Sequence, residues 1–269
     1  MPTTLNPEVQ GKIMAGESQG LTNGQMLPLY AERNIFGIPP DTPIFRIVET
    51  SRLFEDIRDM RLSHTAVSPK KWQDPNENPL LRVRYKDSVT GDDISLASLA
   101  NDLYGVCWSR SPKPASGMWS YYSHGNLAVR LQTTPRKLLE GAMDAGNPFF
   151  MLQHFVGEMK YVSSLEFDEF FQDQDYSKHL DSLGQGLTLS TMRLPLHYSS
   201  EEEVRLVLSV DRNQDWTHRN VTFKVDYASI PFNWANVIDS VVVDPDRGPG
   251  AIPPAIAELA ALGINCPVI

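Results

Sequence analysis

The chain has 269 residues, of which 41% are hydrophobic and 21% are charged, proportions that suit a globular protein with a sizeable core. The formal net charge of −9 argues against a general nucleic-acid binder, because proteins that neutralise phosphates usually carry an excess of lysine and arginine. Two distant cysteines, no basic start followed by an apolar run, and no long apolar stretch predict a cytoplasmic protein without a membrane segment.

Residues 1–43 are predicted to be an N-terminal extension. Prolines and glycines recur throughout it and would punctuate any regular element. We therefore expect the extension to drape over the surface, to add little to the core, and to be a candidate site for a partner protein. Residues 44–269 are predicted to form a single domain that folds without it.

From residue 44 onwards, strands and helices are mixed without strict alternation. Apolar or alternating runs predict strands at 44–48, 61–67, 81–85, 105–109, 127–131, 203–210 and 222–227, with a strand-rich stretch at 148–162. Helical spacing predicts helices at 53–60, at 94–104, from Thr134-Pro135 to near Gly146, and in the acidic segment 164–183. The end is expected to be a β-α-β unit (237–243, 252–262 and 266–269). The fold class is α+β.

Four short boxes of polar and aromatic residues, at 72–77, 107–122, 198–205 and 241–245, carry more chemical detail than a core requires. Their order resembles a bacterial family known only as domain of unknown function twenty-nine seventy-one, over residues 44 to 269. Gln73 and Tyr198 depart from its pattern, and the matching residues are Asp74, Pro75, Glu77, Cys107, Ser109, Met118, Trp119, Tyr122, Glu201, Glu203 and Arg205. The resemblance implies no activity.

Charged side chains in two strands are candidates for a site. Residues two apart on a strand share a face, so Glu201, Glu203 and Arg205 would line one side of it. Two carboxylates on one face repel each other unless a cation, a substrate or solvent separates them. These three residues are either the solvated start of a strand, with Arg205 as the local counter-ion, or part of a functional site. Arg46 poses a related question, because a guanidinium in an apolar strand must find a partner or reach solvent.

The order of Arg46, Ser109 and Glu203 is similar to the arginine–serine–glutamate group of ADP-ribosyltransferases. That resemblance implies that NAD is a substrate, that Arg46 grips its phosphates, and that Ser109 orients the nicotinamide ribose. Glu203, paired with Glu201, would activate the acceptor and steady the oxocarbenium ion. Arginine is suited to a pyrophosphate because its fork binds bidentately.

The same resemblance extends to the fold and to further residues. It implies a mixed, largely antiparallel sheet flanked by helices, with the strands that carry Arg46 and Glu203 as neighbours and both side chains on one face. Trp119 and Tyr122 are candidates for stacking on nicotinamide, and Arg205 is grouped with them as NAD-binding. The enzyme would be a toxin or a phage-defence effector acting on an unknown acceptor macromolecule.

Two other classes of function stay open from the sequence. The first is a Mg²⁺-dependent nuclease that uses Asp74, Glu77, Glu201 and Glu203. The second is a non-catalytic module whose boxes shape a ligand pocket. The histidines show no metal-ligand spacing, so no resident metal site is expected.

Overall fold

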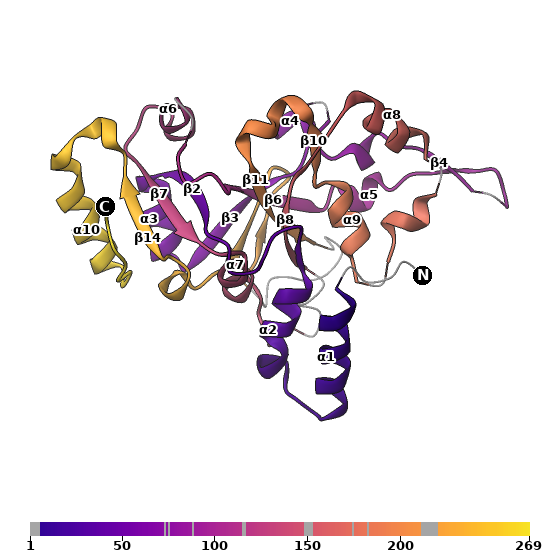
Figure 1. The fold of residues 1–269 in the computed structure, drawn as a ribbon, viewed down its shortest axis with the longest axis horizontal. Helices are drawn as coiled ribbons and strands as arrows, with labels where there is room; N and C mark the ends of the chain where they lie inside the picture. Colours follow the sequence, from indigo (N-terminus) through magenta and orange to yellow (C-terminus); the bar gives the residue numbers. More distant parts are fainter. Residues whose placement is uncertain are drawn as a thin grey trace.

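The computed structural model describes residues 6–72, 74, 76–87, 89–114, 117–147, 153–173, 175–181, 183–210 and 220–269. Within these residues, a ten-stranded sheet runs through the middle of the molecule in the order β1-β8-β11-β6-β2-β7-β14, with β3, β13 and β12 branching from β6 (Figure 1). Its strands are β1 (Ile35–Phe36), β2 (Ile44–Glu49), β3 (Arg61–Ala66), β6 (Leu103–Ser109), β7 (Ala128–Thr133), β8 (His154–Glu158), β11 (Glu203–Ser209), β12 (Thr222–Phe223), β13 (Tyr227–Pro231) and β14 (Ser240–Val243).

Helices surround this sheet, and two small sheets lie beside it. The helices are α1 (Pro7–Ser18), α2 (Asn23–Arg33), α3 (Thr50–Arg58), α4 (Pro69–Trp72), α5 (Ala97–Ala100), α6 (Met118–Ser123), α7 (Pro135–Ala142), α8 (Ser164–Gln172), α9 (Gln185–Ser190) and α10 (Ile252–Ala261). The small sheets pair β4 (Tyr85–Lys86) with β5 (Asp93–Ile94), and β9 (Lys160–Val162) with β10 (Arg193–Pro195). The predicted α+β class is confirmed, since all the long ladders of the main sheet are antiparallel.

The sheet divides at β6. Near its start, Tyr104 and Gly105 pair with β3, whereas at its end only Ser109 pairs with β2. Cys107 lies between these two pairings, so β2 and β3 leave β6 on either side of it. Among the described residues, this division leaves Val106, Cys107 and Trp108 without a ladder partner on that edge of β6.

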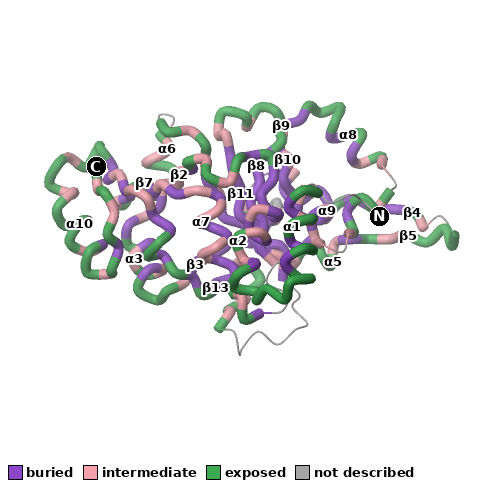
Figure 2. The backbone as a smooth tube through the Cα atoms, turned by 60° about the horizontal axis from the view of Figure 1, so that its bottom comes forward, coloured by how far each residue is buried: buried purple, intermediate pink, exposed green. Residues whose placement is uncertain are grey.

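Two apolar cores fill the two sides of the central strands. Alternate residues of β11 contribute to each, with Val204, Leu206 and Leu208 in one core and Val207 in the other. Helices α1, α2, α3, α7 and α10 supply the first core, and α5, α8 and α9 supply the second. Figure 2 shows the buried backbone concentrated at β8 and β11, where both faces are covered.

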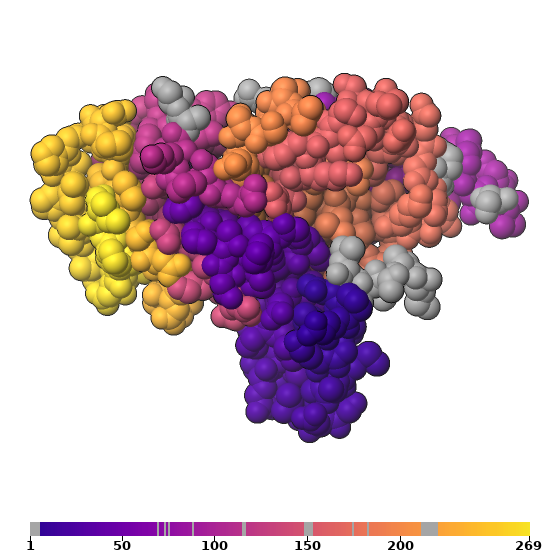
Figure 3. Space-filling view, in the orientation of Figure 1, coloured from indigo at the N-terminus to yellow at the C-terminus, as the bar shows by residue number. Residues whose placement is uncertain are grey.

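The expectation that residues 1–43 lack regular structure is wrong. Thr22 caps α2 in a reciprocal pair with Gln25, and α1 packs beside α2. Ile13 and Met26 are each 1% exposed and belong to the first core. The two helices project from the body (Figure 3), but β1 then enters the main sheet by pairing in parallel with β8. The hydrophobic side chains of this segment bury apolar area, which outweighs its many prolines and glycines.

Most predicted elements from residue 44 onwards are confirmed. Strands lie at or near 44–48, 61–67, 105–109, 127–131 and 203–210, and Thr134 caps α7 as its Thr-Pro pair predicts. The β-α-β unit is confirmed by β14, α10 and a parallel bridge between Val241 and Val268. A strand over 81–85 is wrong, because the chain forms a 3-10 turn at Pro79–Leu81 there. Residues 148–152 lie outside the described part of the chain.

The strands that carry Arg46 and Glu203 are not neighbours, which corrects a second expectation. Both belong to the main sheet, but β6 lies between β2 and β11. In the described parts of the chain, every helix is too short or too polar to cross a bilayer.

Candidate active site

A buried guanidinium holds the centre of the candidate site. Arg205 is 0% exposed, and it donates from Nε to Glu203 Oε1 at 2.8 Å and from Nη2 to Glu203 Oε2 at 3.2 Å. It also donates from Nη1 to Glu77 Oε2 at 2.9 Å and from Nη2 to Glu77 Oε1 at 3.1 Å. Both bonded pairs are bidentate, so the fork of one arginine joins two buried carboxylates. Two carboxylates therefore share one cation away from water.

The surroundings of Arg205 fix its orientation. The carbonyl oxygen of Thr191 accepts a further bond from Nη1 at 3.1 Å, and the guanidinium lies 4.5 Å from the centre of the Trp72 ring. Burial by itself would lower the pKa of Arg205, but the carboxylates of Glu203 and Glu77 outweigh it and hold that pKa well above its ordinary value. The guanidinium is therefore a permanent cation whose hydrogen bonds are taken up within the protein.

Cys107 lies beside this group. It is half-buried and lies opposite Arg205 in the ladder between β6 and β11. Burial, and then the negative charge of Glu203, raise the pKa of Cys107 well above its ordinary value. The thiol therefore stays protonated and is a poor nucleophile.

A left-handed residue separates the two glutamates. Glu201 ends a 3-10 turn (Leu196–Glu201), Glu202 has φ 44° and ψ 44°, and β11 begins at Glu203. A residue that is not glycine adopts this backbone conformation only at a cost, so the turn is held by its surroundings. Ser109 Oγ donates to the carbonyl of Glu201 at 2.8 Å, and the amide of Arg110 donates to the carbonyl of Glu202 at 2.9 Å.

This kink gives the two carboxylates different environments. Glu203 points inward to Arg205 and is 4% exposed, whereas Glu201 is half-buried. Burial, followed by repulsion from Glu203, raises the pKa of Glu201 to about 6. A carboxyl group with a pKa near neutrality can exchange a proton at physiological pH, as a general acid or base requires.

Tyr122 lies on α6 beside these carboxylates. Its pKa is raised by burial first, and then by the negative charges of Cys107, Glu201 and Glu203 when they are ionised. The residue is nevertheless 40% exposed and therefore reaches solvent. Trp119, three residues earlier on α6, is half-buried and lies on the same side of the helix.

Arg46 lies on β2, on the far side of β6 from Glu203. The ladder places Phe45, not Arg46, in the row of Ser109 and Glu203, so Arg46 leaves β2 towards the other face, and the expectation that both side chains share one face is wrong. Its side chain is half-buried, and burial followed by repulsion from Arg52 lowers its pKa. The charge of Asp56 on α3 is the main one that opposes this lowering.

The structure brings some of the sequence-predicted residues together. Glu201, Glu203 and Tyr122 lie near one another on the side of Cys107, whereas Arg46 leaves β2 towards the other face of the sheet. Ser109 and Arg205, expected to contact NAD, instead bond to the protein: Ser109 holds the turn at Glu201 and Arg205 holds Glu203.

The sequence did not predict the contacts of three further residues near Glu203, which are Glu77, Tyr161 and Cys107. Glu77 was matched in a box but its pairing with Arg205 joins positions 128 residues apart. Tyr161 Oη accepts from the amide of Glu203 at 2.7 Å, and only the β9 fold-back places it there. Cys107 was matched in a box, but its apolar neighbours Val106 and Trp108 gave no sign that it would lie near Glu203.

Arg205 occupies the space that a divalent cation would need between Glu77 and Glu203. Among the described residues, no cluster of three or more histidine, cysteine or acidic side chains is arranged to hold a metal ion. The geometry of the acidic residues therefore favours charge pairing with arginine over metal binding.

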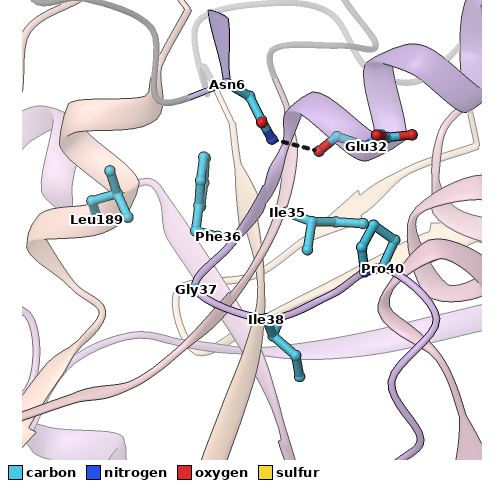
Figure 4. A pocket seen from close by; sticks show the side chains of 8 residues that line it. All are labelled: Asn6, Glu32, Ile35, Phe36, Gly37, Ile38, Pro40 and Leu189. Carbon is cyan, nitrogen blue, oxygen red and sulfur yellow. Dashed lines mark hydrogen bonds between the residues drawn. The ribbon is translucent and has the colours of Figure 1, made fainter. Parts of the chain in front are cut away.

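A cavity of about 500 Å³ lies away from these residues, along β1 at the edge of the sheet. Figure 4 shows that most of its lining comes from the segment around β1, with Leu189 of α9 facing Phe36. The Asn6 amide donates to the backbone carbonyl of Glu32 at 3.2 Å at one end. The cavity is within the usual volume range for a small-molecule pocket.

Comparison with known proteins finds similar solved structures but no matching family model and no matching curated protein. No family model matches the chain, so the resemblance to the domain of unknown function is not confirmed, and no curated protein matches it either. Among solved structures, DarT from Thermus sp. 2.9 in complex with ADP-ribosylated ssDNA is 14% identical, covering 86% of this chain and 94% of that chain with a TM-score of 0.38. The same protein in complex with carba-NAD+ is 14% identical, and in complex with NAD+ 15% identical, each over 86% of this chain and 96% of that chain, with TM-scores of 0.37 and 0.36.

Proposed function

We propose that the chain is an NAD-dependent ADP-ribosyltransferase. The observation that carries this proposal is that Glu201 and Glu203 flank a left-handed residue in a turn held by Ser109, with Tyr122 of α6 close enough for both carboxylates to raise its pKa. An aromatic ring that reaches solvent and a carboxylate are two of the groups that the transfer needs. In this proposal Tyr122 contacts the nicotinamide, Glu201 faces the ribose, and Arg46 contacts the pyrophosphate.

The transfer would proceed at the anomeric carbon of the nicotinamide ribose. The bond from this carbon to the pyridinium nitrogen breaks, nicotinamide leaves with the bonding electron pair, and the ribose becomes an oxocarbenium ion. Negative charge on the opposite face lowers the energy of this cation, as it does in glycoside hydrolysis. An acceptor oxygen or nitrogen then bonds to the carbon, and its proton passes to a carboxylate.

Glu201 is better placed than Glu203 to receive that proton. It is half-buried and has a pKa of about 6, whereas both oxygens of Glu203 are bonded to Arg205. We therefore assign acceptor activation to Glu201, and to Glu203 the fixed negative charge that raises the pKa of Glu201. Arg205 and Ser109 are positioning residues in this scheme, and Trp119 remains a candidate for stacking on the nicotinamide.

The test is nicotinamide release from NAD, with single-stranded DNA, RNA and protein extracts as candidate acceptors. We expect Glu201→Gln to reduce turnover by a factor of about 10² to 10⁴, the usual contribution of general acid–base catalysis. The matched control is Glu202→Gln, which removes the same charge from the neighbouring residue and should leave turnover nearly unchanged. The wild-type rate should fall as pH drops below about 6, when Glu201 becomes protonated.

Two results would contradict the assignment. Turnover unaffected in Glu201→Gln would exclude Glu201 as the base, and the absence of NAD cleavage by the folded wild type with every acceptor would remove the transferase proposal. Growth arrest on expression, abolished by Glu201→Gln, is the corresponding test of a toxin or antiviral role.

A second candidate, a ligand-binding module, is favoured by a different observation. The cavity of about 500 Å³ along β1 is lined mainly by apolar side chains and is separated from Arg205 by β8. Saturable binding of a small molecule there, with no NAD cleavage by the folded protein, would favour this candidate over the enzyme.

A further inference from the structure

The cavity of about 500 Å³ along β1 is lined by one charged residue, Glu32, whose side chain is 34% exposed. Arg136 of α7 lies 3.6 Å from the Glu32 carboxylate, which is too far for a hydrogen bond, because its guanidinium bonds to Asp41 at 2.9 and 3.3 Å. Lys12, which is near enough to interact with the charge of Glu32, is paired with Glu8 at 2.9 Å. The negative charge at the cavity is therefore only partly balanced.

The side chain of Asn6 adds an acceptor beside Glu32. Its amide group donates to the backbone carbonyl of Glu32 at 3.2 Å, which orients the side chain (Figure 4). Its own side-chain oxygen accepts no hydrogen bond from the residues that the structure describes. This oxygen is thus available to a donor in the cavity.

The open edge of the main sheet contributes the backbone of Ile35. The strand β1 is the last in the order of the main sheet and pairs with β8 alone. The amide of Val156 donates to the carbonyl of Asn34 at 2.9 Å, so the next residue, Ile35, directs its own amide and carbonyl away from β8. Ile35 lines the cavity and is 5% exposed, and within the described ranges neither of these groups has a partner. Buried backbone groups are almost always hydrogen-bonded, so this edge is incomplete by itself.

The remaining side chains of the wall are apolar. Figure 4 shows Phe36 and Leu189 towards one end of the cavity, and Pro40 and Glu32 towards the other. A cavity of about 150 Å³ is enough for benzene, and small-molecule pockets usually measure about 300–1,000 Å³. The cavity therefore has room for an aromatic ring or a branched alkyl group, with a short chain that reaches Glu32.

The polar groups of the cavity restrict the chemistry of an occupant. Most of them are acceptors, namely the Glu32 carboxylate, the Asn6 side-chain oxygen and the Ile35 carbonyl. An ammonium group donates three hydrogen bonds and carries the charge that Glu32 lacks. A carboxylate donates none and would be repelled by Glu32, and a hydroxyl donates one without the charge.

We propose that this cavity binds a small primary amine, with its ammonium group against Glu32 and its apolar body against Phe36 and Leu189. The inference rests on the part of the second candidate function that assigns a ligand to this cavity. It holds whether or not the chain cleaves NAD.

The experiment is an NMR titration of the folded full-length chain with ¹³C-labelled isoleucine and leucine methyl groups. The probe is phenethylamine, and the matched controls are phenethyl alcohol, which carries a hydroxyl on the same body, and hydrocinnamate, which carries a carboxylate. We expect phenethylamine to shift the methyl signals of Ile35, Ile38 and Leu189 saturably. The alcohol and the carboxylate should bind more weakly by a factor of about 10 or more.

Two variants test the contact with the carboxylate. Glu32→Gln should weaken the binding of phenethylamine by a factor of about 10 or more and leave that of phenethyl alcohol nearly unchanged. Glu55→Gln is the matched control, because Glu55 is an exposed glutamate of α3 that does not line the cavity, and it should change neither.

The outcomes separate the failure of the inference from that of the second candidate function. If no probe shifts these methyl signals saturably, the cavity holds no ligand of this kind and both are overturned. If phenethyl alcohol binds as tightly as phenethylamine, or Glu32→Gln binds the amine as tightly as the wild type, the cavity binds a ligand but the assignment of an ammonium group is overturned. The three probes on the wild type decide this even if a variant does not fold.

Discussion

At the scale of single residues, the site is organised by one arginine between two glutamates. Removing one partner of a buried ion pair is costly when it leaves a charge unpaired, but the three members of this group are not equivalent. If Glu203 becomes neutral, Arg205 still pairs with Glu77. If Arg205 is removed, two buried carboxylates face each other without a cation.

Arg205→Met should therefore lower the free energy of unfolding by about 3–5 kcal/mol, and Glu203→Gln by clearly less. Arg110→Met is the matched control, because Arg110 forms a half-exposed ion pair with Glu158 at 3.0 Å and should cost below about 1 kcal/mol. Urea denaturation of the three variants measures the order. Equal losses in Arg205→Met and Arg110→Met would show that the buried group does not stabilise the fold.

At the scale of elements, the N-terminal helices are part of the core although their composition suggests a loop. Proline within α2 is tolerated, and a reciprocal cap at Thr22 and Gln25 starts the helix. Neighbouring residues of α1 show the difference between its faces, since Ile13 is 1% exposed and Met14 is 60% exposed. The buried face alone contacts the core.

Ile13→Ala should destabilise the protein by about 2–5 kcal/mol, the usual cost of a cavity in a core. Met14→Ala, its neighbour, should stay within about 0.5 kcal/mol of the wild type. Thermal or urea unfolding of both variants checks this. A loss from Ile13→Ala no larger than that from Met14→Ala would indicate that α1 is not packed in solution.

Deleting residues 1–40 is expected to abolish cooperative unfolding, contrary to the prediction from sequence that residues 44–269 fold alone. The deletion removes β1 from the edge of β8, and with it the Asn34 amide that donates to the carbonyl of His154 at 2.8 Å. Calorimetry of the truncated chain is the measurement. A sharp melting transition with an unchanged midpoint would restore the original boundary at residue 44.

At the scale of the whole molecule, buried histidines link folding to pH. The pKa of His64 and that of His154 are each about 3 in the folded chain, against 6.5 for an ordinary histidine. Between these values the unfolded chain binds more protons than the folded one. The free energy of unfolding must therefore decrease as pH falls from about 6.5 towards about 3.

Each of the two histidines should contribute a slope of up to about 1.4 kcal/mol per pH unit in that window. We expect His154→Phe to flatten the dependence between pH 6.5 and 5, where ordinary carboxylates are still ionised. Glu201, whose pKa is raised to about 6, makes the free energy of unfolding change with pH in the opposite direction. Its contribution is the same in the wild type and in the histidine variants, so it cancels when they are compared. Urea unfolding at several pH values tests this, with His197→Phe as the control, and identical slopes in the three proteins would contradict it.

The sequence by itself determined the local part of this protein. Alternation and apolar runs predicted most strands from β2 to β11, and capping residues such as Thr134 marked where helices begin. The sequence also identified Arg46, Tyr122, Glu201 and Glu203 as candidate site residues. Charged and polar aromatic side chains in or beside apolar strands are costly to bury unless they have a partner.

Only the tertiary structure decided how these elements and residues combine. The order of the strands, with β6 between β2 and β11, follows from long-range pairing that no local pattern encodes. Which of two glutamates is buried depends on the left-handed turn at Glu202 and on Glu77, 128 residues from its partner Arg205. Burial and charge pairing are set by neighbours in space, which the sequence does not show. For that reason Arg205 and Ser109, which were expected to contact NAD, instead bond to Glu203 and to the carbonyl of Glu201.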